Sequence, residues 1–153
     1  MFIDLENIVH AERMAGDSDA AVARVQGLLA TVREDADLVY IVAVCDPWLA
    51  RALGPALHAL GVRVFPHRGG VDEADHRLIE RLAHDVPASC SLLVIASGDH
   101  AFTDAAIEHR NLGRRVQVFA RSGSIAADLY RVVDDFIHLD PSCREHACTS
   151  DVA

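Results

Sequence analysis

Short apolar runs that alternate with amphipathic segments are the feature that most constrains the fold of this chain. They lie at Met1–Asp4, Leu38–Val44, Val62–Phe65, Leu92–Ala96, Val116–Phe119 and Phe136–Leu139. Runs this short predict strands, whereas the longer segments between them carry apolar residues at helical spacing. Strands that alternate with helices build a mostly parallel sheet covered by helices, so we expect an α/β fold.

Capping residues, prolines and glycines mark the ends of the expected helices. These signals predict one helix capped by Ser18 or Asp19, one from Asp46 to Gly61, one from about Asp72 to His84, and one from near Phe102 to Asn111. The segment 121–135 predicts a turn, a short helix and a return to the sheet.

The length of 153 residues suits one domain with a sizeable core. We expect that domain over residues 1–140 and a loosely held polar tail over residues 141–153. Cys143 and Cys148 flank His146 in this tail, but the second ligand pair of a zinc site is missing. No apolar run approaches the roughly 20 residues of a membrane helix, and the N-terminus carries no secretion signal, so a cytoplasmic protein is expected.

The net charge of −9 argues against a protein whose whole surface grips nucleic acid, because such surfaces are rich in Lys and Arg. It does not exclude an enzyme that acts on a phosphodiester. A group of acids that holds a metal adds negative charge, while a few arginines around the site are enough to contact the substrate.

Two aspartates, Asp4 and Asp99, follow predicted buried strands at the point where each strand gives way to a loop. With the strand order 3-2-1-4-5, these strands are neighbours at the crevice where open parallel sheets bind ligands. The third helix starts at the same end of the sheet and brings Asp75 alongside. Three nearby carboxylates repel one another, and a hard divalent cation such as Mg²⁺ or Mn²⁺ compensates that repulsion. The alternative is that each acid only caps a helix.

Other chemistries fit less well. Neither GxGxxG nor GxxxxGK[ST] occurs, so no glycine-rich phosphate loop is expected. Cys45 and Arg51 have the spacing of a cysteine phosphatase, but Asp46 and Pro47 stand where such a loop needs backbone N–H groups for phosphate. Ser97 lacks the Gly-x-Ser-x-Gly elbow of a hydrolase nucleophile, and a hydroxyl that supports a metal-binding aspartate suits it better.

Three stretches taken together resemble the NYN domain, a branch of the PIN-like ribonuclease superfamily. FIDLENI looks like the strand-one motif of the family, with Asp4 and Asn7. VIASGDHAF looks like its serine-glycine-aspartate motif, with Ser97 and Asp99. VDEADHRLI is similar to its middle acidic motif, in which Asp75 stands three residues before a leucine. The resemblance extends over about residues 1–140.

The resemblance implies a three-layer α/β/α sandwich of PIN-like type and a metal-dependent ribonuclease that acts on RNA, whether single-stranded or structured. Asp4, Asp75 and Asp99 would hold Mg²⁺ or Mn²⁺, Asn7 would orient Asp4 or a water, and Ser97 would support the site. The cation would polarise the scissile phosphate and acidify the attacking water. The sequence leaves the oligomeric state open, with a homodimer among the options.

The chain departs from the family pattern at two positions. Ala101 stands where the motif more often has an acid, and Arg81 stands where the middle motif often has another. Asp72, Glu73 or Asp104 could substitute for the missing acids, although Asp104 lies on a different side of its helix and is a poor replacement. These departures keep a second hypothesis open, a catalytically weakened NYN domain that binds RNA or a protein. A flavodoxin-like phosphotransfer module is disfavoured because the chain contains no lysine.

Basic side chains near the predicted site are candidates for substrate contact. His100 follows Asp99 directly and titrates near neutral pH, which suits a proton donor to the leaving group. The candidate phosphate contacts are Arg68, Arg77 and Arg121. Each has an alternative interpretation as an ordinary surface residue. His67, next to Arg68, is expected either in a flexible segment that contacts the substrate or in a solvent-exposed turn.

Overall fold

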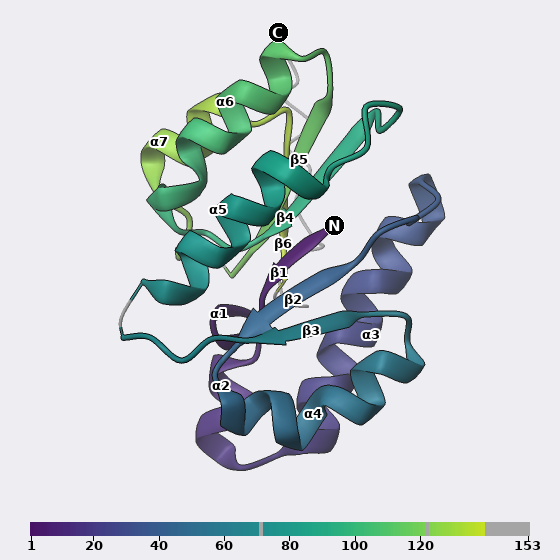
Figure 1. The fold of residues 1–153 in the computed structure, drawn as a ribbon, viewed down its shortest axis with the longest axis vertical. Coiled ribbons are helices and arrows are strands. Elements are labelled where there is room, and N and C mark those ends of the chain that lie inside the picture. Colours follow the sequence, from purple (N-terminus) through teal and green to yellow (C-terminus); the bar gives the residue numbers. More distant parts are fainter. Residues whose placement is uncertain (71, 122, 140–153) are drawn as a thin grey trace, which may run out of the picture.

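The computed structural model of the protein describes residues 1–70, 72–121 and 123–139, and these form one parallel sheet with helices on both faces (Figure 1). The strand order is β3-β2-β1-β4-β5-β6. This confirms the predicted α/β class and the predicted order, to which β6 adds an edge. The strands are β1 (Phe2–Asp4), β2 (Val42–Cys45), β3 (Arg63–Pro66), β4 (Leu92–Ala96), β5 (Arg115–Ala120) and β6 (Asp135–His138).

Strand β2 is shorter than predicted and begins at Val42 rather than Leu38. Its backbone pairs Val42 with Phe2 on one side and with Arg63 on the other, and these two residues are the first of their own strands. Because neither neighbour continues further back, residues 38–40 have no ladder partner on either side and stay outside the sheet.

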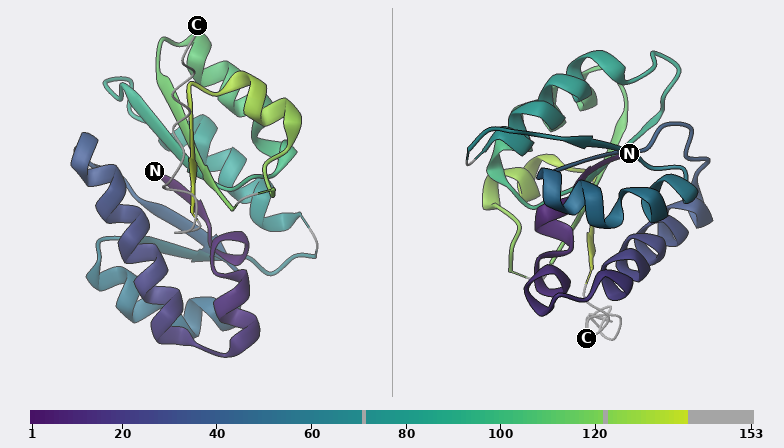
Figure 2. Two further views of the ribbon diagram at one scale, coloured as in Figure 1. Left: turned by 180° about the vertical axis from the view of Figure 1, so that it is seen from behind. Right: turned by 60° about the horizontal axis from the view of Figure 1, so that its bottom comes forward.

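The helices form the two outer layers, which Figure 2 shows from two further directions. One face is covered by α3 (Ser18–Asp35) and α4 (Pro47–Ala59), and the other by α5 (Glu73–Asp85), α6 (Thr103–Asn111) and α7 (Ala127–Val132). Strand β1 shows why two cores result, since Phe2 packs into one and Ile3 into the other. Asp17, rather than Ser18 or Asp19, caps α3, and Asp46 caps α4 as predicted.

Two short helices directly after β1 were not predicted from the sequence. They are α1 (Leu5–Ile8) and α2 (His10–Ala15), and α2 ends at Gly16 in the left-handed conformation. One turn of helix leaves too short an apolar pattern to detect. A similar short element, the 3-10 helix η1 (His100–Phe102), lies between β4 and α6. Both α1 and η1 start next to an aspartate of the predicted site.

The predicted tail with Cys143, His146 and Cys148 lies outside the described residues, and its proposed looseness stays a prediction. Within the described part of the chain, none of the helices combines the length and the apolar composition that a membrane crossing requires.

Candidate active site

Three of the predicted aspartates lie at the carboxyl ends of the central strands. Asp4 is the last residue of β1, and Asp99 follows β4 by three residues. These two strands are hydrogen-bonded neighbours, in which Ile3 pairs with Ala96. Asp75 lies in the first turn of α5, which packs against β1 and β2. The carboxyl ends of β1 to β3, α1 and the start of α5 gather on the left of Figure 1. We refer to Asp4, Asp75 and Asp99 as the acid cluster.

A buried serine joins two members of the acid cluster. The Ser97 hydroxyl donates to Asp4 Oδ2 at 3.3 Å and accepts from the backbone N–H of Asp99 at 3.3 Å. Ser97 is fully buried, so these contacts are its environment rather than a chance surface geometry. The serine therefore fixes the end of β4 against the carboxylate that ends β1.

Asp4 also begins the helix that follows it. Its Oδ1 accepts from the backbone N–H of Asn7 at 3.2 Å, which makes Asp4 the N-cap of α1. It is therefore the backbone of Asn7 that contacts Asp4, and the role of Asn7 in a site stays a prediction. The capping alternative and the ligand hypothesis are compatible for Asp4, because its other oxygen faces Ser97.

The acid cluster holds more negative charge than its surroundings compensate. Burial raises the pKa of Asp4 from 3.8 to about 7, with a further contribution from repulsion by Asp75. Burial likewise raises the pKa of Asp75 to about 6, followed by repulsion from Asp99 and Asp72. Both carboxyl groups therefore keep their protons to a higher pH than an exposed aspartate does.

The acid cluster is close enough for mutual repulsion, but its side chains are not in a coordinating arrangement. No group of three or more His, Cys, Asp or Glu side chains in the described ranges is placed to hold a metal ion. The donor set itself suits a hard divalent cation, because it is made of anionic oxygens whose burial makes charge neutralisation favourable. A bound cation would have to draw the three carboxylates together.

Asp72 lies at the rim of the acid cluster. It precedes α5 with a left-handed backbone, φ +70°, and its side chain makes no capping hydrogen bond. Its carboxylate is exposed and acts on the pKa of Asp75. Of the predicted ligands, Asp72 is the one that the structure leaves most open to solvent.

The predicted substrate-contacting residues divide into two kinds. His100 is 82% exposed in its side chain and its Nδ1 lies 3.0 Å from Asp99 Oδ1. Arg68 is exposed, and Arg77 makes only a surface pair with Glu73 at 3.2 Å. Arg121 differs, because its guanidinium donates to the backbone oxygen of Ile8 at 3.1 Å and to Glu12 at 3.2 Å. Arg121 thus joins the end of β5 to α2, and its guanidinium is committed to the protein rather than to a substrate.

A second cluster of polar side chains lies at the same carboxyl end of the sheet and was not predicted from the sequence. Glu6 Oε1 accepts from the backbone N–H of Asp46 and lies against His67 Nε2, both at 2.8 Å. Arg13 bridges Glu6 Oε2 at 3.2 Å and Asp46 Oδ2 at 2.9 Å. We call Glu6, Arg13, Asp46 and His67 the paired network. It ties α1 and α2 to the ends of β2 and β3.

His67 corrects the sequence interpretation directly, since it is buried rather than in an exposed turn. Asp46 and His67 each come directly after a strand, as Asp4 comes at the end of one, and this position was the available signal. Their common partner Glu6 lies about 40 and 61 positions away along the chain, so no local pattern reveals the contact.

Gly98 is required by a close approach of two loops. A Cβ atom there would lie 2.3 Å from the backbone oxygen of Ser124, and the Gly98 oxygen accepts from Ala126 N–H at 2.8 Å. The segment that leads into α7 therefore rests directly on the residue between Ser97 and Asp99. This contact explains why a glycine separates the two site residues.

Comparison with known proteins agrees with this architecture. The profile of the NYN domain family matches residues 1–140. A crystal structure of a protein of unknown function from Vibrio parahaemolyticus superimposes with a TM-score of 0.62 at 18% sequence identity, over 92% of this chain and 91% of that chain. Its low identity makes this a likeness of fold. No curated protein matches the sequence.

Proposed function

The chain belongs to the NYN domain family, whose members are generally nuclease-like, and on that premise we propose that it is a metal-dependent ribonuclease that hydrolyses RNA phosphodiester bonds. The acid cluster is the observation that carries this proposal. Burying carboxylates beside one another costs free energy unless a cation or another function compensates it. Within the described residues, Asp4 and Asp75 have no Arg or His ion-pair partner.

Asp4, Asp75 and Asp99 would hold Mg²⁺ or Mn²⁺, with Asp72 at the rim as a further ligand. A divalent cation bound there supplies positive charge against the scissile phosphate and lowers the pKa of the attacking water. Ser97 orients Asp4 through its hydroxyl, and the Asn7 N–H holds the second oxygen of that carboxylate. These two contacts keep Asp4 in one orientation while a ligand binds.

The open side of the acid cluster carries the groups for substrate. His100 is positioned beside Asp99 and exposed, so in its protonated form it can give a proton to the leaving oxygen. Arg68 and Arg77 are close to the start of α5 and offer positive charge to the neighbouring phosphates. The acids and these bases together would orient one phosphodiester against an activated water.

A second candidate function is a catalytically weakened NYN domain that binds RNA or a protein without cutting. Two observations favour it. The described residues lack a ready metal-coordinating group, and Ala101 and Arg81 replace acids of the family pattern. Arg81 forms an ion pair with Asp85 at 2.8 Å, and its positive guanidinium cannot act as a metal ligand.

The deciding experiment is cleavage of single-stranded RNA by the purified wild type and by Asp99→Asn, each with and without Mn²⁺. We expect cleavage only by the wild type with Mn²⁺. Asp104→Asn is a matched control, because Asp104 is an exposed aspartate in the first turn of α6. Equal cleavage by Asp99→Asn and the wild type would point to a contaminating nuclease. RNA binding without cleavage would favour the weakened domain.

A further inference from the structure

Arginine and aromatic side chains alternate along the edge of the sheet beside α5. The guanidinium carbon of Arg81 lies 3.4 Å from the ring centre of Phe65, and that of Arg63 lies 5.3 Å from the ring centre of Tyr40. Asp85 joins the two pairs, since it accepts from the Tyr40 hydroxyl at 2.7 Å and from Arg81 at 2.8 Å. We call Arg63, Tyr40, Arg81 and Phe65 the arginine strip.

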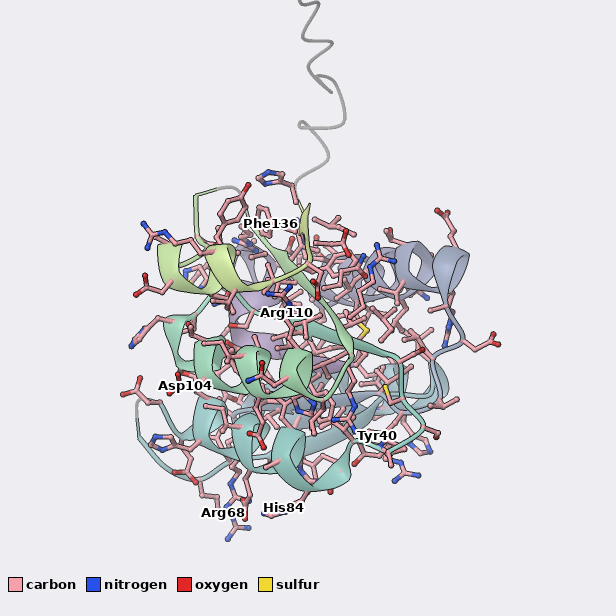
Figure 3. All side chains as sticks on the ribbon, turned by 90° about the horizontal axis from the view of Figure 1, so that it is seen from above. Tyr40, Arg68, His84, Asp104, Arg110 and Phe136 are labelled. Atoms are coloured by element: carbon pink, nitrogen blue, oxygen red, sulfur yellow. The ribbon has the colours of Figure 1, made fainter. Side chains whose placement is uncertain are left out.

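The arginine strip begins near the acid cluster and runs away from it. Along β3, Phe65 is next to the carboxyl end and Arg63 is at the amino end, about 10 Å from Pro66 at the usual strand rise. Helix α5 runs in the opposite sense, from Asp75 in its first turn through Arg77 to Arg81. Figure 3 shows Arg68 and His84 at the lower border of the molecule, with Tyr40 further in and to the right. A chain that leaves the acid cluster on this side therefore meets one arginine after another.

The charges of this surface are available to an anionic ligand. Arg63 and Arg68 are exposed and have no carboxylate partner among the described residues. Arg77 and Arg81 pair with acids one turn along the same helix, at 3.2 and 2.8 Å. The Arg77 pair is exposed and therefore weak, so a phosphate competes with it readily. Arg81 is only partly exposed, but its guanidinium has further N–H donors besides the one that binds Asp85. The side chains of Arg77, Glu80, Arg81, His84 and Asp85 also line an open groove along α5.

We propose that the arginine strip binds the single-stranded RNA on which the acid cluster acts and guides it from the acid cluster toward the amino end of β3. This inference rests on the proposed function, and it adds a substrate path and a strand state to it. The guanidinium groups of Arg81 and Arg63 lie over aromatic rings, and unstacked bases stack on guanidinium planes and aromatic rings. A duplex keeps its bases stacked on one another, so the arginine strip selects single strands.

Because the arginine strip extends away from the acid cluster, the experiment varies the length of the RNA. A short oligonucleotide fills only the acid cluster and its nearest arginines, whereas a longer one reaches Arg63. The test measures binding of a labelled tetranucleotide and a labelled dodecanucleotide RNA by fluorescence anisotropy, in EDTA so that no metal-dependent cutting occurs, over a series of salt concentrations. The proteins are the full-length wild type, Arg63→Gln, Arg81→Gln and Arg51→Gln. Arg51 is an exposed arginine on α4, on the other face of the sheet, and serves as the matched control.

We expect Arg63→Gln and Arg81→Gln to weaken dodecanucleotide binding about 3- to 10-fold and to make its salt dependence shallower by about 0.7 for each lost phosphate contact. The tetranucleotide should be affected less by Arg63→Gln, and Arg51→Gln should match the wild type with both. Arg63→Lys retains the charge without the planar group, so we expect it to restore the salt dependence but not the full affinity. Thermal unfolding of each variant checks that the fold is intact.

Strip variants that bind the dodecanucleotide as tightly as Arg51→Gln would overturn the inference, and so would an equal loss with both RNA lengths. If the wild type still cleaves RNA with Mn²⁺ in that case, the nuclease proposal survives alone. If RNA binding depends on the arginine strip but no cleavage occurs with Mn²⁺, the inference about the strip is supported and the nuclease proposal is contradicted. A wild type that neither binds RNA in EDTA nor cleaves it with Mn²⁺, as expected of a domain with a protein partner, would overturn both.

Discussion

The acid cluster and the paired network both lie at the carboxyl ends of the strands of one sheet, yet they differ in how their negative charge is compensated. In the paired network, Arg13 and His67 lie against the carboxylates of Glu6 and Asp46. In the acid cluster, burial raises the pKa of Asp75 to about 6, and repulsion from other acids adds to this. Asp99 has an ion pair there, but its partner His100 is 82% exposed. The difference teaches that acids at strand ends do not identify a site by themselves. What separates the two groups is whether the protein supplies its own counter-charge.

Removal of one acid from each group should give the largest contrast. We expect Asp4→Asn to lower Mn²⁺-dependent RNA cleavage by about 100-fold or more, because it removes the negative charge of a proposed metal ligand while an oxygen remains for the Ser97 hydroxyl. Asp46→Asn removes an acid of the paired network but keeps a side-chain oxygen for its capping role, so its cleavage rate should stay close to that of the wild type. Initial rates at saturating Mn²⁺ measure both. Equal losses in the two variants would erase the distinction.

The pH dependence of stability without metal should be the next largest effect. The pKa of Asp4 is raised in the folded state, so the folded protein binds this proton more tightly than the unfolded chain. That contribution is complete below about pH 4 and is lost as the pH rises toward about 7. Relative to Asp4→Asn, the unfolding free energy of the wild type should therefore fall by on the order of 2–4 kcal/mol over this range.

Urea unfolding at a series of pH values measures this difference, with EDTA in one set and Mn²⁺ in the other. Mn²⁺ should reduce the loss near neutral pH, since a cation replaces the proton as the compensating charge. A constant difference between the two proteins at all pH values would contradict the raised pKa of Asp4. An unchanged wild-type curve with Mn²⁺ would contradict metal binding at the acid cluster.

Breaking the paired network should affect stability more than chemistry. Glu6→Ala leaves the Asp46 N–H and His67 without their shared acceptor, so we expect a loss of about 1–3 kcal/mol in unfolding free energy. Glu6→Gln keeps an oxygen for these donors and should lose less. Urea unfolding measures both variants, and Mn²⁺ affinity measured by calorimetry should change little. A large loss of Mn²⁺ affinity in Glu6→Gln would place Glu6 with the acid cluster instead.

The smallest effect is expected at the rim. Asp72→Asn removes an exposed charge that raises the pKa of Asp75, and asparagine tolerates the left-handed backbone of this position. We expect Mn²⁺ affinity to fall only about 2- to 5-fold, as is typical of an exposed charge. Calorimetric titration with Mn²⁺ gives the value. A loss as large as that of Asp4→Asn would make Asp72 a full ligand.

The parts of this molecule that were predictable from the sequence are those specified by local patterns. The run Leu92–Ala96 forms β4 with the predicted bounds, because a short run of successive apolar residues suits a central strand that is covered by helices on both faces. Asp4 and Asp99 were predicted to lie near each other because each ends an apolar run, and their strands are neighbours in the sheet. The one-turn helix α1 was missed, since four residues cannot show a helical period.

Pairing between distant residues limited the prediction of the site. Arg121 has the charge and the sequence position expected of a substrate contact. Its hydrogen bonds to Ile8 and Glu12, more than 100 residues earlier, show that it joins parts of the protein instead. His67 was likewise misjudged because its partner is on α1. Charge patterns in one dimension identify candidates, but compensation is decided in three dimensions.

The contact between Gly98 and Ser124 has a practical consequence for anyone who redesigns this domain. The loop over residues 123–126 sits on the backbone just before Asp99 with no room for a methyl group. A graft, an insertion or a larger side chain at Gly98 or in the loop over residues 123–126 would therefore displace Asp99. Engineers who wish to vary specificity should therefore treat these two stretches as one mechanical unit and exchange them together.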